Sequence, residues 1–282
     1  MNVKQLKLGD FGQRAWVFKK NKNMLRSKTY GRVFNHSLFA LAICAGVSTQ
    51  AVPIYWTDWQ TGATGPGSAF TGTGTITTPT SSVTVTYSNL QGISFFNDGV
   101  GGETDYWRQG SSGSLGRNPA RSPYTSATVD NIPTGTDMIA LSKAGDQTLT
   151  FSEAIANPVF SFISLNANYW AFDHDFDILS FGNASDGNDI GYWGSGTATK
   201  TVVVVAGVTE YRLSGSGEPH GTIQFKEEVS SITWRSQNNE NWNGFTIGVE
   251  GTAAEIPDGG GLFIPALLTM GGLLYSRRRL QS

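Results

Sequence analysis

A carboxylate and an imidazole lie two residues apart in the segment Gly217–Gly221, which reads Gly-Glu-Pro-His-Gly. Pro219 fixes its φ angle and the flanking glycines permit a tight backbone, so Glu218 and His220 are predicted to lie in a rigid turn. A Glu/His pair suits general acid–base work, and Glu240 supplies the second carboxylate that a glycosidase needs. The alternative is a structural turn in which the glutamate caps nearby backbone N–H groups. No nucleophile elbow, zinc-protease motif or phosphate loop occurs in the sequence.

Three carboxylates, Asp173, Asp175 and Asp177, occur at every second residue. In an extended strand this spacing places them on one face, where Ca²⁺ would find several oxygens close together. The segment is not an EF-hand loop, because Ile178 stands where glycine is required and Ala184 where a bidentate glutamate is required. The alternative is the solvent-facing side of an edge strand, where charge discourages aggregation. Apart from this calcium site, we expect no cofactor.

Four Tyr-Trp pairs recur between residues 55 and 193. Adjacent side chains of a strand point to opposite faces, so one ring of each pair is predicted to enter the core and the other to face outward. An outward ring beside Asp or Asn offers an apolar platform with polar edges, which suits the C–H face of a sugar. The alternative is that these rings only fill the core. The residues predicted to bind a ligand are Tyr169, Trp170, Tyr192, Trp193 and Trp242, with Trp170 and Trp193 as the best candidates.

The elements that must position these residues are short strands separated by turns rich in Gly, Asn, Asp and Pro. Two runs of apolar, β-branched or aromatic residues, 159–165 and 201–205, have a composition suited to central strands. The other predicted strands cover 82–87, 147–151, 231–234 and 243–249. No helical period of useful length occurs before residue 253.

Many short strands with glycine-rich turns predict an all-β fold of the β-sandwich or jelly-roll type. We expect a single domain over 52–252, with a boundary near 122–130 as the alternative. A long exposed loop is expected over 109–124, which is rich in Ser, Gly, Arg and Pro.

Charge is distributed unevenly along the 282 residues. Residues 1–51 carry nine Lys/Arg and one Asp, whereas residues 52–252 carry eight Lys/Arg and nineteen Asp/Glu. The acidic body argues against nucleic-acid binding, which needs clustered Lys/Arg. The basic stretch leads into the apolar run 37–47 and then into small residues, the layout of a signal peptide cleaved after Ala51. The single cysteine, Cys44, lies in that apolar run, so we expect no disulfide in the body.

The C-terminal stretch 253–282 has three parts. A short Pro-containing motif over 256–260 is followed by the apolar segment 261–275, which is predicted to form a transmembrane helix. An arginine triplet ends the stretch and is predicted to stay in the cytoplasm by the positive-inside rule. The residues predicted to carry sorting are Ile256, Pro257, Asp258, Gly259, Arg277, Arg278 and Arg279.

This three-part tail resembles the PEP-CTERM sorting signals of Gram-negative bacteria, in a variant close to the Val-Pro-Asp-Ser-Gly form. The resemblance implies that an exosortase-type membrane enzyme processes the tail. It also implies an exported protein that is anchored in the inner membrane before processing and then reaches the cell surface or extracellular matrix. The segments 147–151, 157–160, 217–221 and 242–248 resemble, more loosely, the β-rich cargo domains of such proteins. The alternative is a simple C-terminal membrane anchor.

These observations favour an exported, non-enzymatic β-sandwich that binds or sits within extracellular polysaccharide. One alternative is a secreted glycan-acting hydrolase that uses Glu218 and Glu240 as its carboxylate pair. A second alternative is a purely structural matrix protein without a ligand.

Overall fold

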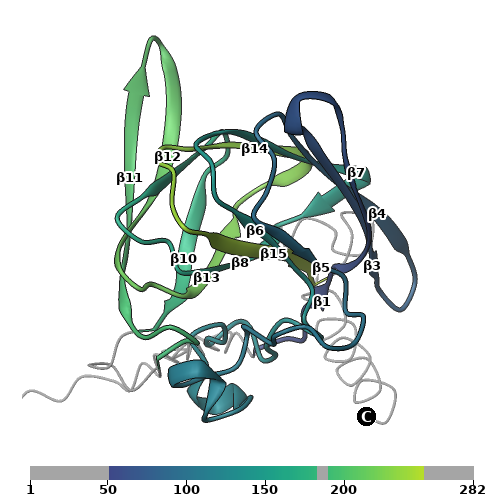
Figure 1. The fold of residues 1–282 in the computed structure, drawn as a ribbon, viewed down its shortest axis with the longest axis vertical. Helices are drawn as coiled ribbons and strands as arrows, with labels where there is room; N and C mark the ends of the chain where they lie inside the picture. Colours follow the sequence, from purple (N-terminus) through teal and green to yellow (C-terminus); the bar gives the residue numbers. More distant parts are fainter. Residues whose placement is uncertain (1–50, 183–189, 251–282) are drawn as a thin grey trace, which may run out of the picture. The chain divides into compact units, whose positions relative to one another are not determined.

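Antiparallel strands dominate residues 51–182 and 190–250, the parts of the chain that this computed structural model describes (Figure 1). The predicted signal peptide and the predicted sorting tail lie outside the described residues. Within them, helical structure is limited to three 3₁₀ turns: η1 (Pro66–Ser68), η2 (Ser111–Gly113) and η3 (Pro119–Arg121). No helix among them is long and apolar enough to cross a membrane. The prediction of an all-β fold is confirmed.

The first sheet has seven strands in the order β10-β13-β8-β15-β6-β5, with β1 paired to β15. Its strands are β1 (Tyr55–Trp56), β5 (Phe95–Asn97), β6 (Met138–Leu141), β8 (Val159–Ile163), β10 (Phe176–Phe181), β13 (Gly221–Phe225) and β15 (Asn243–Val249). Every pairing in this sheet is antiparallel. All seven residues of β15 are buried, in keeping with its central place.

The second sheet has eight strands in the order β11-β12-β9-β14-β7-β4-β3-β2. Its strands are β2 (Asp58–Thr64), β3 (Phe70–Thr77), β4 (Ser82–Asn89), β7 (Gly145–Ala156), β9 (Tyr169–Phe172), β11 (Gly196–Val205), β12 (Val208–Gly217) and β14 (Glu228–Ser236). In β4 the valines and the tyrosine of Ser-Val-Thr-Val-Thr-Tyr are buried, and the residues between them are exposed or half-buried. That alternation is the one expected of a strand with a single buried face.

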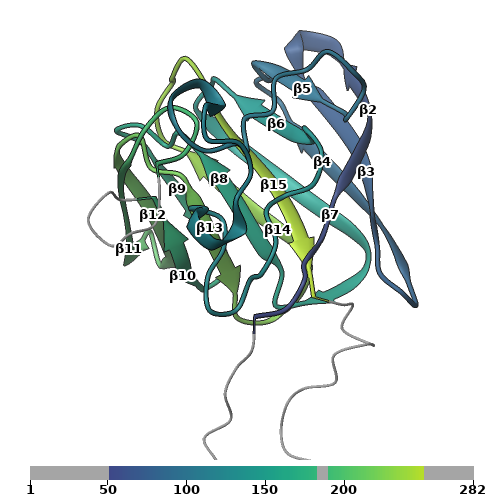
Figure 2. The ribbon, with the colours of Figure 1, turned by 90° about the horizontal axis from the view of Figure 1, so that it is seen from below.

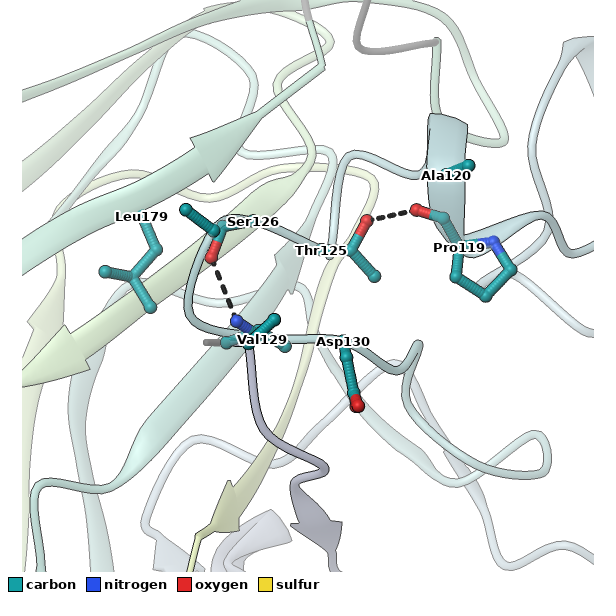
Figure 3. A pocket seen from close by; sticks show the side chains of 9 residues that line it. Pro119, Ala120, Thr125, Ser126, Val129, Asp130 and Leu179 are labelled. Carbon is teal, nitrogen blue, oxygen red and sulfur yellow. Dashed lines mark hydrogen bonds between the residues drawn. The ribbon is translucent and has the colours of Figure 1, made fainter. Parts of the chain in front are cut away.

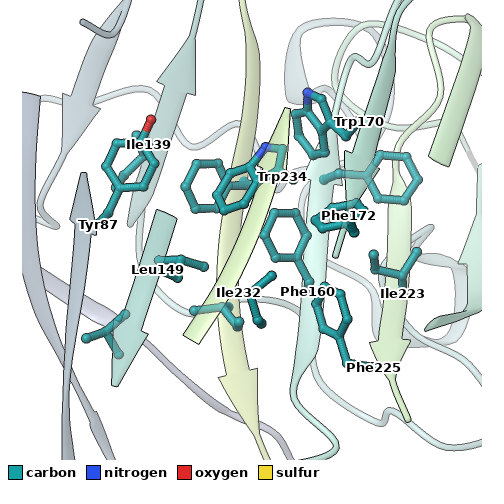
Figure 4. Close-up of a cluster of buried hydrophobic side chains, with 14 of the residues drawn as sticks. Tyr87, Ile139, Leu149, Phe160, Trp170, Phe172, Ile223, Phe225, Ile232 and Trp234 are labelled. Atoms are coloured by element: carbon teal, nitrogen blue, oxygen red, sulfur yellow. The ribbon is translucent and has the colours of Figure 1, made fainter. Parts of the chain in front are cut away.

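Aromatic rings from both sheets meet in one core (Figure 4). Phe160 on β8 lies 5.6 Å from the ring of Trp234 on β14 and 5.7 Å from that of Phe172 on β9. Within its own sheet Phe160 stacks on Phe245 at 5.1 Å, and Tyr87 of the second sheet lies 5.4 Å from Phe245. The two antiparallel sheets therefore pack face to face, an arrangement consistent with a β-sandwich (Figure 2).

The apolar run 201–205 does form a strand, but the prediction that this strand is central is wrong. It lies in β11, which is the edge of the second sheet and pairs only with β12. Val202 and Val204 are 56% and 70% exposed, because their end of the β11–β12 hairpin extends beyond the core, as Figure 1 shows. Apolar composition alone therefore did not reveal the position of this strand in the sheet.

Four connections near the C-terminal half of the fold pass from one sheet to the other. They are β8 to β9, β10 to β11, β12 to β13 and β14 to β15. Hydrogen bonds join them: the backbone N–H of Leu165 donates to Pro219 O, that of Glu218 to Ser195 O at 3.0 Å, and that of Asn238 to Asn168 Oδ1 at 2.9 Å. The four connections therefore gather at one place, and they position the candidate site.

Candidate functional site

A pocket of about 330 Å³ lies among these four connections. Its lining residues are Ser164, Asn166, Trp193, Glu218, Asn241 and Trp242, and we call it the aromatic–carboxylate pocket. Every one of the four connections contributes at least one of these residues. Its volume falls at the lower end of the range typical of small-ligand sites. The structure thus brings together Trp193 and Trp242, which were predicted to bind a ligand, and Glu218, which was considered as a catalytic carboxylate.

One wall of the pocket is aromatic. Trp193 is 46% exposed, and its ring lies 6.2 Å from that of Trp242 and 4.8 Å from that of Tyr192. Tyr106, from the long β5–β6 connection, lies 4.8 Å from Trp242 and 4.9 Å from Tyr192. Phe95 completes the group at 5.1 Å from Trp242. These contacts hold the rings in place, so Trp193 and Trp242 give the pocket a preformed apolar surface.

A second part of the lining carries the carboxylate of Glu218. One of its oxygens accepts a hydrogen bond from Asn166 Nδ2 at 2.6 Å, and the other accepts one from Ser164 Oγ. Both donors come from the β8–β9 connection. A carboxylate offers about four lone-pair positions, so each oxygen keeps one acceptor position that no other described residue fills.

Glu240 lies behind this wall and does not line the pocket. Its carboxylate accepts hydrogen bonds from Asn168 Nδ2 at 2.6 Å, Asn243 Nδ2 at 2.7 Å and the backbone N–H of Asn166 at 3.2 Å. Burial, together with the nearby charge of Glu218, raises the pKa of Glu240 to about 7 against these hydrogen bonds. Asn166 thus donates to both carboxylates, and Glu240 holds in place the loop that orients Glu218.

His220 is fully buried and joins two of the connections. Its Nε2 accepts the backbone N–H of Trp193 at 3.4 Å, so Nδ1 carries the proton that it donates to the carbonyl of Glu218 at 2.8 Å. Burial lowers the pKa of His220 to about 4, although its backbone hydrogen bonds oppose that shift. The imidazole is therefore neutral at pH 7 and ties the Trp193 segment to the Glu218 turn.

The β8–β9 connection holds its backbone in an uncommon conformation. Ser164 and Ala167 have φ angles of +57° and +43°, in the left-handed region that non-glycine residues rarely adopt. Each such residue costs on the order of 1–3 kcal/mol and persists only where its surroundings enforce it. Here the enforced geometry points Ser164 Oγ at Glu218 and explains why the predicted strand 159–165 ends at Ile163.

Gly191 offers a test of how tightly the two connections pack. A Cβ at this position would lie 2.1 Å from Cδ2 of the buried His220 ring, so the chain must move to admit one. We expect Gly191→Ala to lower the free energy of unfolding by about 1–3 kcal/mol and to displace Trp193. Urea unfolding and a ligand titration measure the two effects.

Gly101 is the matched control for that substitution, because a Cβ there would meet nothing within 4 Å. Gly101→Ala is expected to change the free energy of unfolding by no more than about 0.5 kcal/mol. Equal stability of the two variants would contradict the described contact between Gly191 and His220.

The pair Tyr169-Trp170, which was also predicted to bind a ligand, does not line this pocket. Trp170 is fully buried in the core, 5.7 Å from the ring of Phe160, so it offers no platform to a ligand. Its neighbour Tyr169 faces the other side of the sheet, where Arg212 lies 4.6 Å from its ring and its hydroxyl donates to Gln237. Opposite faces were expected for the pair, but the assignment of Trp170 to the surface is wrong.

The three aspartates that were predicted to bind calcium are instead paired with lysine or histidine side chains. Asp175 pairs with Lys200 and Lys226, Asp177 pairs with Lys226 at 2.9 Å, and Asp173 contacts His174 at 2.6 Å. Only Asp177 belongs to a strand, because residues 173–175 form the turn before β10. The premise of one extended face is therefore wrong. Among the described residues, no group of three or more His, Cys, Asp or Glu is placed to hold a metal ion.

A second cavity, of about 500 Å³, lies away from the aromatic–carboxylate pocket (Figure 3). Its lining is mostly small residues such as Ala120, Thr125 and Ser126, and Asp130 is its one charged side chain. Thr125 donates to the carbonyl of Pro119, so that hydroxyl serves the loop itself. Although this cavity is larger, it has neither an aromatic face nor a set of converging polar groups, and we do not assign it a function.

Several residues of the site escaped the sequence-based predictions. Ser164, Asn166 and Asn168 follow a buried strand, where the motif Asn-x-Asn after a run of apolar residues was the only available signal. Tyr106 was noted only as one of four similar pairs. The segment 109–124, expected to be an exposed loop, is exposed in its middle but buried at Gln109 and at Ser122 to Tyr124.

Comparison with known proteins adds no further assignment. No family model matches the chain, and neither the curated proteins nor the solved structures give a significant match. The functional conclusion therefore depends on the geometry of the pocket.

Proposed function

We propose that this protein binds extracellular polysaccharide at the aromatic–carboxylate pocket and does not cleave it. The observation that carries the proposal is the convergence of Trp193, Trp242 and Glu218 on one preformed pocket. A sugar ring has an apolar C–H face and a polar rim, and this pocket offers indole faces beside amide and carboxylate acceptors. The rings hold each other in place, and Ser164 and Asn166 hold the carboxylate. Binding a ligand therefore costs little side-chain conformational entropy.

Binding is favoured over hydrolysis because the second carboxylate does not reach the ligand side. A glycosidase places two carboxyl groups on either side of the scissile bond, with room for sugar or water between them. Here Asn166 lies between Glu218 and Glu240 and donates to both. His220 is buried and neutral at pH 7, and both of its nitrogens are engaged, so it is poorly suited to transferring a proton to a ligand.

The test is a panel of neutral, acidic and amino-sugar polysaccharides probed with the purified full-length chain. The proposal predicts saturable binding to at least one of them, and loss of that binding in the Trp193→Ala, Trp242→Ala double variant. Absence of binding to every member of the panel would favour the purely structural matrix protein instead. Release of reducing ends by the wild type, abolished in Glu218→Gln, would favour the hydrolase.

Delivery to the cell surface is part of the same proposal and depends on the sequence resemblance of the tail. We propose that an exosortase-type enzyme recognises the motif 256–260 and that the arginine triplet holds the tail at the inner membrane. Deleting Arg277–Arg279 is then expected to reduce processing, detected as a shift in mature mass and in membrane fractionation. Unchanged mass and unchanged fractionation would contradict the sorting assignment.

A further inference from the structure

The charge of the aromatic–carboxylate pocket is entirely negative. Glu218 is the only charged residue among the described residues that line it, and Glu240, mostly protonated at pH 6, adds little charge behind Asn166. No described Lys or Arg lines it; Arg108, which neighbours Tyr192 across Gly113, stands outside the lining. Between residues 52 and 252 the chain carries nineteen Asp/Glu against eight Lys/Arg, so the electrostatic potential around this part of the protein is negative too. An anionic sugar would therefore meet repulsion with no compensating cation.

The polar groups around the carboxylate mainly offer acceptors. Asn166 must turn its Nδ2 toward Glu218, because an ionised carboxylate can only accept. Its Oδ1 is buried and has no hydrogen-bond partner among the described residues, so it can accept from a ligand only if the side chain shifts. Glu218 keeps an open acceptor position on each oxygen, as argued above. A ligand group with several N–H donors and no acceptor would satisfy this wall better than a single hydroxyl.

The aromatic wall favours the same kind of ligand. A cation is attracted to the face of an aromatic ring, most strongly to indole, when it lies within about 6 Å of the ring centre. Trp193 and Trp242 line the same small pocket as Glu218. An ammonium group placed there gains contacts with the indole rings and with the carboxylate together.

Building on the proposed function, we propose that the pocket recognises a glycan with free amino groups, a de-N-acetylated amino sugar, and binds its ammonium beside Glu218 and Asn166. The ring of that sugar lies against Trp193 and Trp242. An N-acetyl group at the same position would bring a carbonyl oxygen, an acceptor, toward a wall of acceptors. The pocket therefore distinguishes the free amine from its acetylated form.

The test compares a glucosamine hexamer with its matched N-acetylglucosamine hexamer, by calorimetric titration of the full-length chain at pH 6. We expect the wild type to bind the free-amine oligomer at least about tenfold more tightly, with a preference that weakens as salt is raised. Glu218→Gln is expected to remove most of the preference and to keep binding through the indoles. Trp193→Ala is expected to weaken both oligomers.

Glu228→Gln is the matched control, because it removes one exposed carboxylate outside the pocket. The proposal is overturned if the wild type binds both oligomers equally or prefers the acetylated one. It is also overturned if Glu218→Gln and Glu228→Gln reduce the preference equally, since the effect would then reflect net charge alone. Failure to bind any oligosaccharide of the panel would instead remove the proposed function itself.

Discussion

Replacing Trp193 by alanine is expected to weaken glycan binding about tenfold to a hundredfold while leaving the fold nearly as stable as before. Almost half of this side chain is exposed, so its removal changes the free energy of unfolding by no more than about 1 kcal/mol. Trp170→Ala is expected to do the opposite and cost about 3–5 kcal/mol of stability, because it empties a fully buried site in the core.

Urea unfolding and calorimetric titration with the tightest-binding oligosaccharide of the panel separate the two variants. The contrast tests whether two residues with the same sequence context, a Trp after a Tyr, have different roles. The account is contradicted if Trp193→Ala binds like the wild type. It is also contradicted if Trp170→Ala unfolds with the wild-type free energy.

Acidification is expected to destabilise the protein through His220. Its pKa is lowered from 6.5 to about 4 in the fold, so between these values the unfolded chain binds the proton and the native state does not. The stability that comes from burying the neutral ring is therefore complete above pH 6.5 and is lost as pH falls toward 4. A shift of this size corresponds to about 3 kcal/mol, because one pKa unit is worth about 1.4 kcal/mol.

Glu240 and Asp137 work in the opposite direction. Burial raises the pKa of Glu240 from 4.5 to about 7 and that of Asp137 from 3.8 to about 6, so the fold favours their protonated forms. Their contribution to stability is complete below the unfolded pKa values and is lost as pH rises through 6 and 7. Together the two carboxyl groups outweigh His220, so the net effect of the three groups is to raise the free energy of unfolding as pH falls from 8 to 4, although His220 alone opposes that rise.

The measurement is urea unfolding between pH 4 and pH 8 for the wild type and for His220→Gln. The variant lacks the titrating ring, so its free energy of unfolding is expected to rise more steeply than that of the wild type as pH falls from 6.5 to 4. Profiles that run parallel over that interval would show that His220 titrates normally and would contradict its role as a neutral link between Trp193 and Glu218.

The strands were largely predictable because one buried face imposes a period of two. The alternating residues of β4 were recognised for that reason. The edge position of β11 was not predictable, since a run of valines suits a central strand and a protruding hairpin equally well. Sheet order depends on pairings between distant segments, which local composition does not encode.

The candidate site was predictable only in part. Glu218, Trp193 and Trp242 were predicted from their residue types, but their meeting depends on three separate connections between the two sheets. Alternation predicted that Tyr169 and Trp170 face opposite ways without saying which one faces the core. The calcium hypothesis failed because it assumed an extended strand where the chain turns. In addition, Asp175 is paired with Lys200 and Lys226, which lie 25 and 51 residues further along the chain.

The most direct test of the central claim is to follow the indole N–H resonances of the eight tryptophans by NMR during titration with the tightest-binding oligosaccharide of the panel. The account predicts that the resonances of Trp193 and Trp242 shift with the ligand, whereas those of the buried Trp59, Trp170 and Trp234 stay in place. Saturable binding that leaves Trp193 and Trp242 unmoved would contradict it, because the glycan would then be bound somewhere other than the aromatic–carboxylate pocket.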